Sequence, residues 1–415
     1  MNRRRDPEDP RNFLVFSVLS YVEVLRPSYF VLENVEGMIS PTMSVGKERQ
    51  GFLKVLVMTL LELGYGVRVS HVQAARCGAA TMRDRIILMA SREGLPLPRH
   101  PTATNVLPST TIEKVTLEPT PAAPRQYRCF TDEEFAEGCA PHPALTVASA
   151  LSDLPIWDWQ DPHSAIQETQ QDQELARRRK QGIPVYAGDS QRPLIGPRLQ
   201  SYSSPPKNVF QALMRWGSAG RVTQHQTLRF SSLEIERVVQ LPFRRGANHE
   251  SWASAYVGRP HLTPGRLESQ SAFSPAGGSA GGGWGDGTTP MDRAERLRIR
   301  DEVRRADRSY RRIEADKPCP MLFTTAAPGA YNGPCIHHNA ARALTLRERM
   351  RVQGFPDSVS FYGTPDEVQQ QVGNAVPVPL GMAIGRCLLE SWDSQGSSAG
   401  EKSERRGEKR KAGAM

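Results

Sequence analysis

Apolar residues follow a helical spacing near the start of the chain and then form a short continuous run. Between residues 12 and 25 their spacing is close to the period of a buried helix, and Pro27 is expected to end that helix. The run Tyr29 to Leu32 is typical of a strand buried on both faces, as in a parallel sheet. The chain is therefore predicted to open with a helix and a buried strand.

The same alternation continues further along the chain. Residues 51–63 predict a second helix, which Gly64 closes, and residues 65–74 and 86–90 predict two more strands. Because helices and strands follow one another in turn, the pattern favours an α/β layer.

From about residue 95 the long periodic segments disappear. Residues 145–257 hold short apolar clusters among polar residues, which predicts an irregular second domain. Residues 258–289 are a low-complexity Gly/Ser/Pro segment that cannot bury a core. Residues 291–312 alternate acidic and basic side chains, as in a solvated charged helix.

Regular patterns return at residue 341. Residues 342–354 predict a helix, residues 371–377 a turn, and residues 380–392 a final apolar helix. Residues 394–415 consist largely of Gly, Ser, Glu, Lys and Arg, so we expect a disordered basic tail there.

Composition narrows the class of protein. The 415 residues carry a net charge of +9, which favours an acidic partner such as nucleic acid but is weak support by itself. Six cysteines without a CxxC pair predict neither a disulfide scaffold nor a metal site. No apolar run reaches the roughly 18 residues of a membrane helix, and the N-terminus has no signal-peptide pattern. Membrane and secreted classes are excluded.

The first candidate functional cluster is Glu33-Asn34-Val35, at the carboxyl end of a predicted strand. In open α/β sheets that end of a strand faces the ligand crevice, where a carboxylate can hold the edge of a heterocycle. Taken alone, the three residues fit a helix-capping loop better.

The second cluster leads into the strand at residues 86–90. Arg83 and Arg85 stand at i and i+2 of an extended segment, so their side chains point the same way and can grip one acidic group. Two exposed arginines at the start of a strand are the alternative.

Two further clusters lie near the C-terminus. The first holds Arg347-Glu348 and leads to Gly354-Phe355-Pro356-Asp357. The second, residues 371–377, places Gly373-Asn374 before a helix, where backbone N–H groups and an amide side chain can contact a cofactor. Each can also be read as a turn or a cap.

In this order the four clusters resemble the later signature motifs of the cytosine-5 DNA methyltransferases, in particular the eukaryotic maintenance-type branch. Glu33-Asn34-Val35 resembles motif VI, and Arg83-Asp84-Arg85 resembles motif VIII. The Arg347-Glu348 helix with its Gly-Phe-Pro-Asp sequence resembles motif IX, and residues 371–377 resemble motif X. The resemblance covers about residues 1–257 and 309–390, and four motifs in order are far more specific than one.

The resemblance implies a fold and a function. The fold would be α/β, an incomplete Rossmann-like S-adenosylmethionine-dependent methyltransferase domain with an irregular target-recognition domain. The protein would transfer methyl from S-adenosylmethionine to C5 of cytosine in DNA. Its partners would be double-stranded DNA with a flipped cytosine and chromatin proteins, with no membrane, and it would act in the nucleus. The domains would span residues 1–98, 99–339 (with an insertion at about 258–305) and 340–393, before a tail at 394–415.

The resemblance also assigns site residues. Glu33 would hydrogen-bond the N3/N4 edge of the cytosine, and Arg83 and Arg85 would hold the base carbonyl or a nearby phosphate, so these three are the predicted catalytic residues. Asn374 and Val376 would contact S-adenosylmethionine, and Gly373 would allow a close backbone approach. Arg347 and Glu348 are expected to have a structural role.

Two departures from the family pattern stand out. Thr81 replaces the glutamine that usually opens motif VIII. The first residues of the chain resemble the sequence that directly follows the Pro-Cys motif in family members. Motifs I to IV are therefore predicted to be absent. None of the six cysteines fits the role of the nucleophile. We therefore expect the carboxyl-terminal part of a methyltransferase, inactive alone; the alternative is a non-catalytic DNA- or chromatin-binding remnant.

Overall fold

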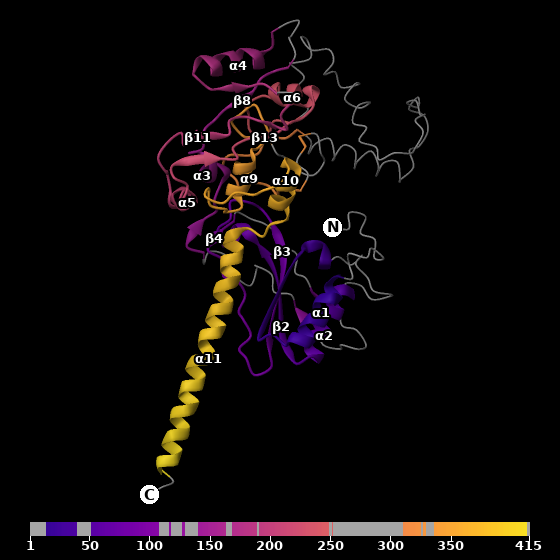
Figure 1. Ribbon diagram of the computed structural model, residues 1–415, viewed down its shortest axis with the longest axis vertical. Helices are drawn as coiled ribbons and strands as arrows, with labels where there is room; N and C mark the ends of the chain where they lie inside the picture. The colour runs from indigo at the N-terminus through magenta and orange to yellow at the C-terminus, as the bar shows by residue number, and fades with distance from the viewer. Residues whose placement is uncertain are drawn as a thin grey trace, which may run out of the picture. The chain divides into compact units, whose positions relative to one another are not determined.

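The computed structural model separates the chain into two compact units (Figure 1). Unit 1 holds residues 1–145 and 376–415, and unit 2 holds residues 146–375. The predicted segment 258–289 and most of 291–312 lie outside the described residues. The structure describes residues 14–39, 51–107, 116–117, 127–128, 140–162, 168–188, 191–248, 251, 310–324, 327–328 and 336–412.

Unit 1 contains the alternating helices and strands that the sequence predicts. Its main strands are long enough to form a sheet, whereas β4 to β7 are two-residue pairs. The elements are α1 (Leu14–Leu25), β1 (Tyr29–Val35), η2 (Glu36–Ile39), α2 (Gly51–Glu62), β2 (Tyr65–Gln73), η3 (Ala74–Cys77), β3 (Asp84–Arg92), β4 (Asn105–Val106), β5 (Thr116–Leu117), β6 (Tyr127–Arg128), β7 (His142–Pro143) and α11 (Val378–Ala412).

The sheet of unit 1 has the order β1-β3-β2, and β3 runs antiparallel to both neighbours. The expected parallel pairing of Tyr29–Leu32 is wrong, although Phe30 and Leu32 pack on one face of the sheet and Val31 packs on the other. All residues of β1 are half-buried, and no second strand pairs with β1 among the described residues. The most deeply buried strand of this sheet is β3, where residues 86–90 are inaccessible to solvent. An apolar run predicts a strand but not its neighbour, because pairing depends on distant segments.

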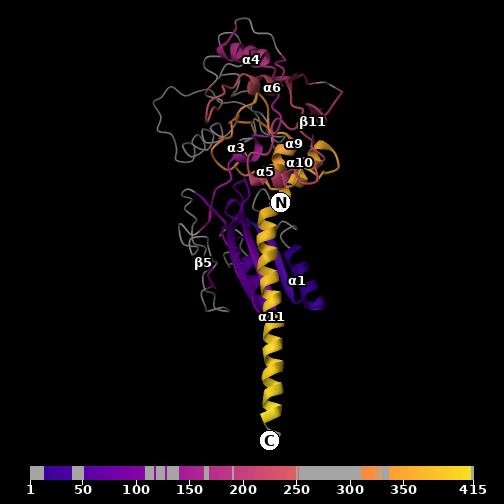
Figure 2. The ribbon, with the colours of Figure 1, turned by 90° about the vertical axis from the view of Figure 1, so that its left-hand side faces the viewer.

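Each face of this sheet has its own core. Helices α1 and α2 cover the face that carries Val69, Ile86 and Leu88. Helix α11 packs on the opposite face, where Leu380 and Ile384 meet side chains that include Ile87 and Met89. Figure 2 shows α11 in front of the strands when that face is viewed directly. Because side chains alternate between the two faces along β3, this strand contributes residues to both cores.

Helix α11 is longer than the sequence predicts. The expected helix covers residues 380–392 and is followed by a disordered tail, but the structure continues the helix from Val378 to Ala412. Extending an existing helix avoids the cost of nucleation, and the tail is rich in Glu, Lys and Arg, which propagate helices well.

Unit 2 is irregular, as the sequence predicts, with strands of only two or three residues. Many of its short helices begin with a capping box. The elements are α3 (Val147–Leu151), β8 (Asp158–Trp159), α4 (Gln170–Lys180), β9 (Val185–Tyr186), β10 (Leu194–Ile195), β11 (Leu199–Ser201), α5 (Val209–Met214), β12 (Arg221–Thr223), β13 (Thr227–Leu228), α6 (Ser232–Val239), α9 (Leu346–Val352) and α10 (Pro365–Asn374).

The C-terminal part of unit 2 differs from the sequence prediction in two places. The helix expected at 342–354 is shorter, because Thr345 caps its start at Leu346 and the helix ends at Val352. The turn expected at 371–377 is instead the last turn of α10 followed by a short break. Residues 340–375 belong to unit 2.

Two buried tryptophans, Trp157 and Trp159, form the centre of the unit 2 core. Gly196 has a φ of +111°, and a Cβ at this position would lie 2.5 Å from Cζ2 of Trp157. Because both the backbone conformation and the contact exclude a side chain, glycine is required where this loop passes the indole ring.

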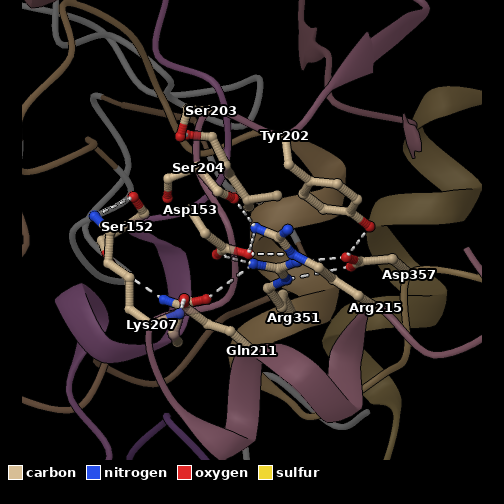
Figure 3. Close-up of polar contacts among 12 residues, drawn as sticks. Ser152, Asp153, Tyr202, Ser203, Ser204, Lys207, Gln211, Arg215, Arg351 and Asp357 are labelled. Carbon is tan, nitrogen blue, oxygen red and sulfur yellow. Dashed lines mark hydrogen bonds and ion pairs between the residues drawn. The ribbon is translucent and has the colours of Figure 1, made fainter. Parts of the chain in front are cut away.

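Buried arginines connect the loops of unit 2. Arg351 on α9 bonds the carboxylates of Asp153 and Asp357, and it also donates to the carbonyl of Ala150. The hydroxyl of Tyr202 donates to Asp357 over 2.7 Å. Figure 3 shows Asp153, Asp357 and Tyr202 around the guanidinium of Arg351. One side chain therefore ties the end of α3 to α9 and to the loop that follows α9.

His225 is a second buried polar group of unit 2. Its Nε2 lies 2.8 Å from the carbonyl oxygen of Pro155 and its Nδ1 lies 3.0 Å from the hydroxyl of Thr345. A neutral ring that donates from Nε2 and accepts at Nδ1 satisfies both contacts. Burial lowers the pKa of His225 to about 4.

Acid is therefore expected to destabilise unit 2. The folded state binds fewer protons at His225 than the unfolded state between about pH 6.5 and pH 4, so the free energy of unfolding falls as the pH falls through this window. In urea titrations, His225→Gln should reduce that slope by up to about 1.4 kcal/mol per pH unit. His142→Gln, at an exposed site, is the control, and equal slopes for wild type and His225→Gln would contradict the assignment.

Candidate active site

The pairing of β1 with β3 brings the first two sequence clusters together. Val35 lies opposite Arg85 in the register, so the side chain of Glu33, two residues earlier, projects on the same face as that of Arg85. Nε of Arg85 lies 2.6 Å from Oε1 of Glu33. The Glu33 side chain keeps 28% exposure whereas Arg85 keeps 5%, so the pair places a buried cation behind a partly accessible carboxylate.

Arg83 is the third predicted catalytic residue, and it is 2% exposed just before β3. Burial, and secondarily the charge of Arg85, lower the pKa of Arg83 to about 10, while Glu33 acts in the opposite direction. Burial also lowers the pKa of Arg85. Two guanidinium groups thus interact electrostatically with the one carboxylate of Glu33. This excess of positive charge suits an electron-rich ligand.

Gln73 holds the backbone of this site in place, a role that the sequence did not reveal. Its Oε1 accepts from the backbone N–H of Arg83 over 2.5 Å, and its Nε2 donates to Oδ1 of Asp84 over 2.7 Å. Gln73 lies directly opposite Asp84 in the register. Only the pairing of β2 with β3 makes this contact, so no local motif could have predicted it.

Asp84 lies between the two predicted catalytic arginines but is not part of their site. In the register it shares a face with Gln73 and His71, toward α1 and α2, whereas Glu33 and Arg85 project toward the α11 face. Burial raises the pKa of Asp84. The sequence cluster Arg83-Asp84-Arg85 therefore divides between the two faces of the sheet.

Comparison with known proteins gives these residues a context. The family profile described as "C-5 cytosine-specific DNA methylase" matches residues 2–189 and 249–390. The chain belongs to this family. The match leaves out residues 190–248, which lie in unit 2.

Plant proteins are among the relatives of this chain. "DNA (cytosine-5)-methyltransferase 4" of Arabidopsis thaliana is 27% identical over 383 residues, covering 91% of this chain and 20% of the relative. "DNA (cytosine-5)-methyltransferase 3" of Zea mays is 25% identical over 414 residues, covering 95% of this chain and 38% of the relative. The chain therefore spans about a fifth to two fifths of these relatives.

A solved structure supports the fold class. The crystal structure of a putative DNA modification methyltransferase encoded within a prophage (E. coli) matches with a TM-score of 0.50 and 17% identity. The match covers 93% of this chain and 75% of the other. The fold is α/β, of the methyltransferase type.

The residues that resemble the cytosine-5 methylase motif X lie along the chain where it passes from unit 2 to unit 1, between Ala375 and Val376. Gly373 and exposed Asn374 close α10 in unit 2, while half-buried Val376 packs with apolar side chains of unit 1. A Cβ on Gly373 would lie 2.7 Å from Cα of Thr324. The close approach that Gly373 allows in this structure is to the chain's own backbone.

The methylase motif IX residues Arg347 and Glu348 have structural partners in unit 2. Arg347 donates to the carbonyl oxygens of Thr223, Pro356 and Val359. The carboxylate of Glu348 accepts hydrogen bonds from both terminal nitrogens of Arg342, over 2.7 and 2.8 Å. Although burial acts to raise it, the pKa of Glu348 is held well below its ordinary value by the Arg342 guanidinium.

The described part of the chain holds no group of three His, Cys, Asp or Glu residues that could hold a metal ion. Within the same residues, no single helix is long and apolar enough to cross a membrane. Helix α10 and residues 378–395 reach the necessary length and apolar character only together, as a pair bent by 41°.

Removing the Gln73 side chain is expected to loosen the site. In Gln73→Ala the buried N–H of Arg83 and the carboxylate of Asp84 lose a partner, so the free energy of unfolding should fall by about 2–3 kcal/mol in urea titrations. Gln181→Ala, at an exposed position after α4, should change it by less than about 0.5 kcal/mol. Equal effects in the two variants would contradict the role of Gln73.

Proposed function

We propose that the protein containing this chain transfers a methyl group from S-adenosylmethionine to C5 of cytosine in DNA, and that Glu33, Arg83 and Arg85 hold the cytosine. Membership of the cytosine-5 methylase family supports the reaction. The observation that carries the site is the ion pair of Glu33 with buried Arg85, which joins two sequence motifs on one face of the sheet.

Glu33 is suited to the polar edge of a cytosine that has left the helical stack. The Nε of Arg85 occupies one side of the carboxylate, which fixes its orientation and leaves acceptor capacity for the ring. The N4 amino group would donate to Glu33, and a proton held between the Glu33 carboxyl group and N3 would offset the negative charge that thiolate attack places on the ring. Arg83 and Arg85 then supply N–H donors for the base carbonyl or a phosphate.

The nucleophile for such a reaction is a thiolate that attacks C6 of the ring. Cys77, Cys319 and Cys387 are buried, and burial raises the pKa of the Cys387 thiol to about 11. Pro318-Cys319 contains a Pro-Cys dipeptide, but its sulfur is inaccessible. Cys129, Cys139 and Cys335 lie outside the described residues. The Pro-Cys dipeptides at 318–319 and 334–335 lack the flanking residues of the family motif, and we propose that a Pro-Cys segment outside these 415 residues supplies the thiolate.

S-adenosylmethionine would supply an activated methyl group on a sulfonium ion. Of the three motif X residues, Asn374 and Val376 fit it, with an exposed amide and a half-buried apolar side chain. Gly373 fits less well, because the backbone of Thr324 occupies the space beside its Cα. We assign Asn374 and Val376 to the cofactor and give Gly373 a packing role.

The finer assignments follow from the same reaction. Double-stranded DNA with a flipped cytosine is the proposed substrate, part of unit 2 is the proposed target-recognition region, and the nucleus, with chromatin proteins as neighbours, is the proposed place of action. The basic segment 401–411 supports nuclear entry or added DNA affinity through its excess of Lys and Arg.

Glu33→Gln tests the site in a protein that joins this chain to a family Pro-Cys segment. An amide still forms hydrogen bonds but cannot supply the acid or charge, so the rate of labelled-methyl transfer should fall by about a hundredfold or more. The Kd for duplex DNA should stay nearly unchanged, because phosphate contacts dominate affinity.

Glu36→Gln is the matched control, since Glu36 is an exposed carboxylate on η2, three residues further along. It should keep the wild-type rate. A Glu33→Gln protein with wild-type turnover would remove Glu33 from the site. DNA binding without methyl transfer in the joined protein would favour a non-catalytic DNA-binding remnant.

A further inference from the structure

Helix α11 carries a row of apolar side chains on the side that faces away from the sheet of unit 1. Met382, Leu389 and Trp392 are 57%, 59% and 58% exposed. Together with Gly385 they follow one another at intervals of three, four and three residues, so they lie in one line along the helix. These four residues, which we call the α11 row, form an exposed apolar surface in the part of the chain that the structure describes.

The opposite side of α11 fixes the helix to unit 1. Leu380 and Ile384 are buried in the core that α11 shares with the sheet, and helix geometry points them away from the α11 row. The hydroxyl of Tyr29 on β1 donates to the carbonyl of Ser391 over 3.3 Å, and its ring centre lies 6.4 Å from that of Trp392. Figure 2 shows α11 in front of the strands of unit 1. The α11 row is therefore presented by a helix that is already held in place, which lowers the entropy lost on binding.

Gly385 leaves a gap within the α11 row. A Cβ at this position would have no heavy atom of the described residues within 4 Å, and Gly385 lacks the positive φ that often explains a glycine. Glycine also weakens a helix, so neither the backbone conformation nor packing within the chain accounts for it. The missing side chain leaves room for a group from another molecule.

The α11 row is complementary to itself. When two copies of α11 lie antiparallel about a two-fold axis at residue 387, Met382 is opposite Trp392 of the other copy and Gly385 is opposite Leu389, because residue 387 is midway between the members of each pair. The Leu389 side chain then fills the gap at Gly385, and the methionine sulfur meets the indole ring, a favourable contact. A different partner would not require the row to be symmetric about its own centre.

The charges on one flank of the α11 row fit the same arrangement. Arg386, Glu390 and Asp393 are exposed, and helix geometry places all three on one flank of the row. The two-fold axis brings this flank opposite the same flank of the other copy. Helical side chains lean toward the N-terminus of their own helix. Arg386 therefore leans toward Glu390 and Asp393 of the other copy and away from its own counterpart, so charges of opposite sign meet twice.

We propose that α11 binds a second copy of this chain, with the two α11 rows packed antiparallel and Leu389 of each copy in the gap at Gly385 of the other. The row has too few side chains to bury the about 1,600 Å² of a standard interface, so the dimer is weak, with a Kd of the order of 10–100 µM. The inference concerns α11 and does not depend on the proposed function.

Sedimentation equilibrium of the full chain tests the dimer, at concentrations from about 1 to about 300 µM, on either side of the expected Kd. The wild type should fit a monomer–dimer equilibrium, and Leu389→Glu should raise the Kd at least about tenfold because it places a charge in the centre of the interface. Leu199→Glu is the matched control, since Leu199 on β11 is 48% exposed, and it should dimerise as the wild type does. A monomeric wild type at the highest concentration, or equal Kd values for the two variants, would overturn the proposal.

Exchanging the large and the small residue of the α11 row tests the fit itself. Gly385→Leu adds apolar surface and improves helix propensity, so it would strengthen a non-specific apolar contact. The proposed fit requires the opposite result, a Kd at least about tenfold higher, because the gap for Leu389 is closed. The double variant Gly385→Leu with Leu389→Gly restores one large and one small residue at each contact and should recover most of the affinity. A tighter dimer in Gly385→Leu, or no recovery in the double variant, would overturn the arrangement.

Charge reversal tests the antiparallel direction in the same experiment. Arg386→Glu should weaken the dimer about threefold or more, because three carboxylates then meet on the flank of each copy. Adding Glu390→Arg and Asp393→Arg to Arg386→Glu reverses every charge and should restore the wild-type Kd. Arg177→Glu, at an exposed position on α4, should leave the Kd unchanged. A triple variant as weak as Arg386→Glu alone would contradict the pairing of Arg386 with Glu390 and Asp393.

Discussion

Arginine side chains buried among loops hold unit 2 together. Short strands leave many backbone carbonyl oxygens without a partner in regular structure, and each guanidinium offers five N–H donors. Arg312 donates to the carbonyls of Leu241, Pro242, His337 and Ala340. Arg347 and Arg351 do the same for other loops, and Arg351 also bridges two carboxylates. Such arginines replace the sheet hydrogen bonds that an irregular domain lacks.

The buried arginines change how the positive net charge of the chain should be interpreted. Part of the net charge of +9 belongs to buried cations whose partners are the chain's own carbonyls and carboxylates, and these cations cannot attract an external anion. The cations accessible to an external anion are exposed ones such as Arg198 and Arg221. Charge therefore indicates function only after burial separates structural arginines from accessible ones.

Local motifs and hydrophobic periodicity indicated different parts of this structure. Glu33, Arg83 and Arg85 came from local sequence clusters, and the β1–β3 register brings them together. Periodicity gave the helices and strands of unit 1, but not the antiparallel order, because pairing partners lie far apart in sequence. Gln73 was missed for the same reason, since its contacts exist only across β2 and β3. The length of α11 was missed because composition suggested a tail, whereas helix propagation continues through it.

Hydrogen exchange in an Arg351→Met protein tests the arginine framework most directly. Removing the guanidinium takes one of two cations from each of the buried carboxylates of Asp153 and Asp357, which keep Arg215 and Arg347, and breaking buried pairs of this kind costs about 3–5 kcal/mol. Amides of α3, α5 and α9 should then lose protection, while those of β1 to β3 in unit 1 keep theirs. Arg177→Met, at an exposed position on α4, should leave both units unchanged. Wild-type protection throughout unit 2 in the Arg351→Met protein would contradict the framework.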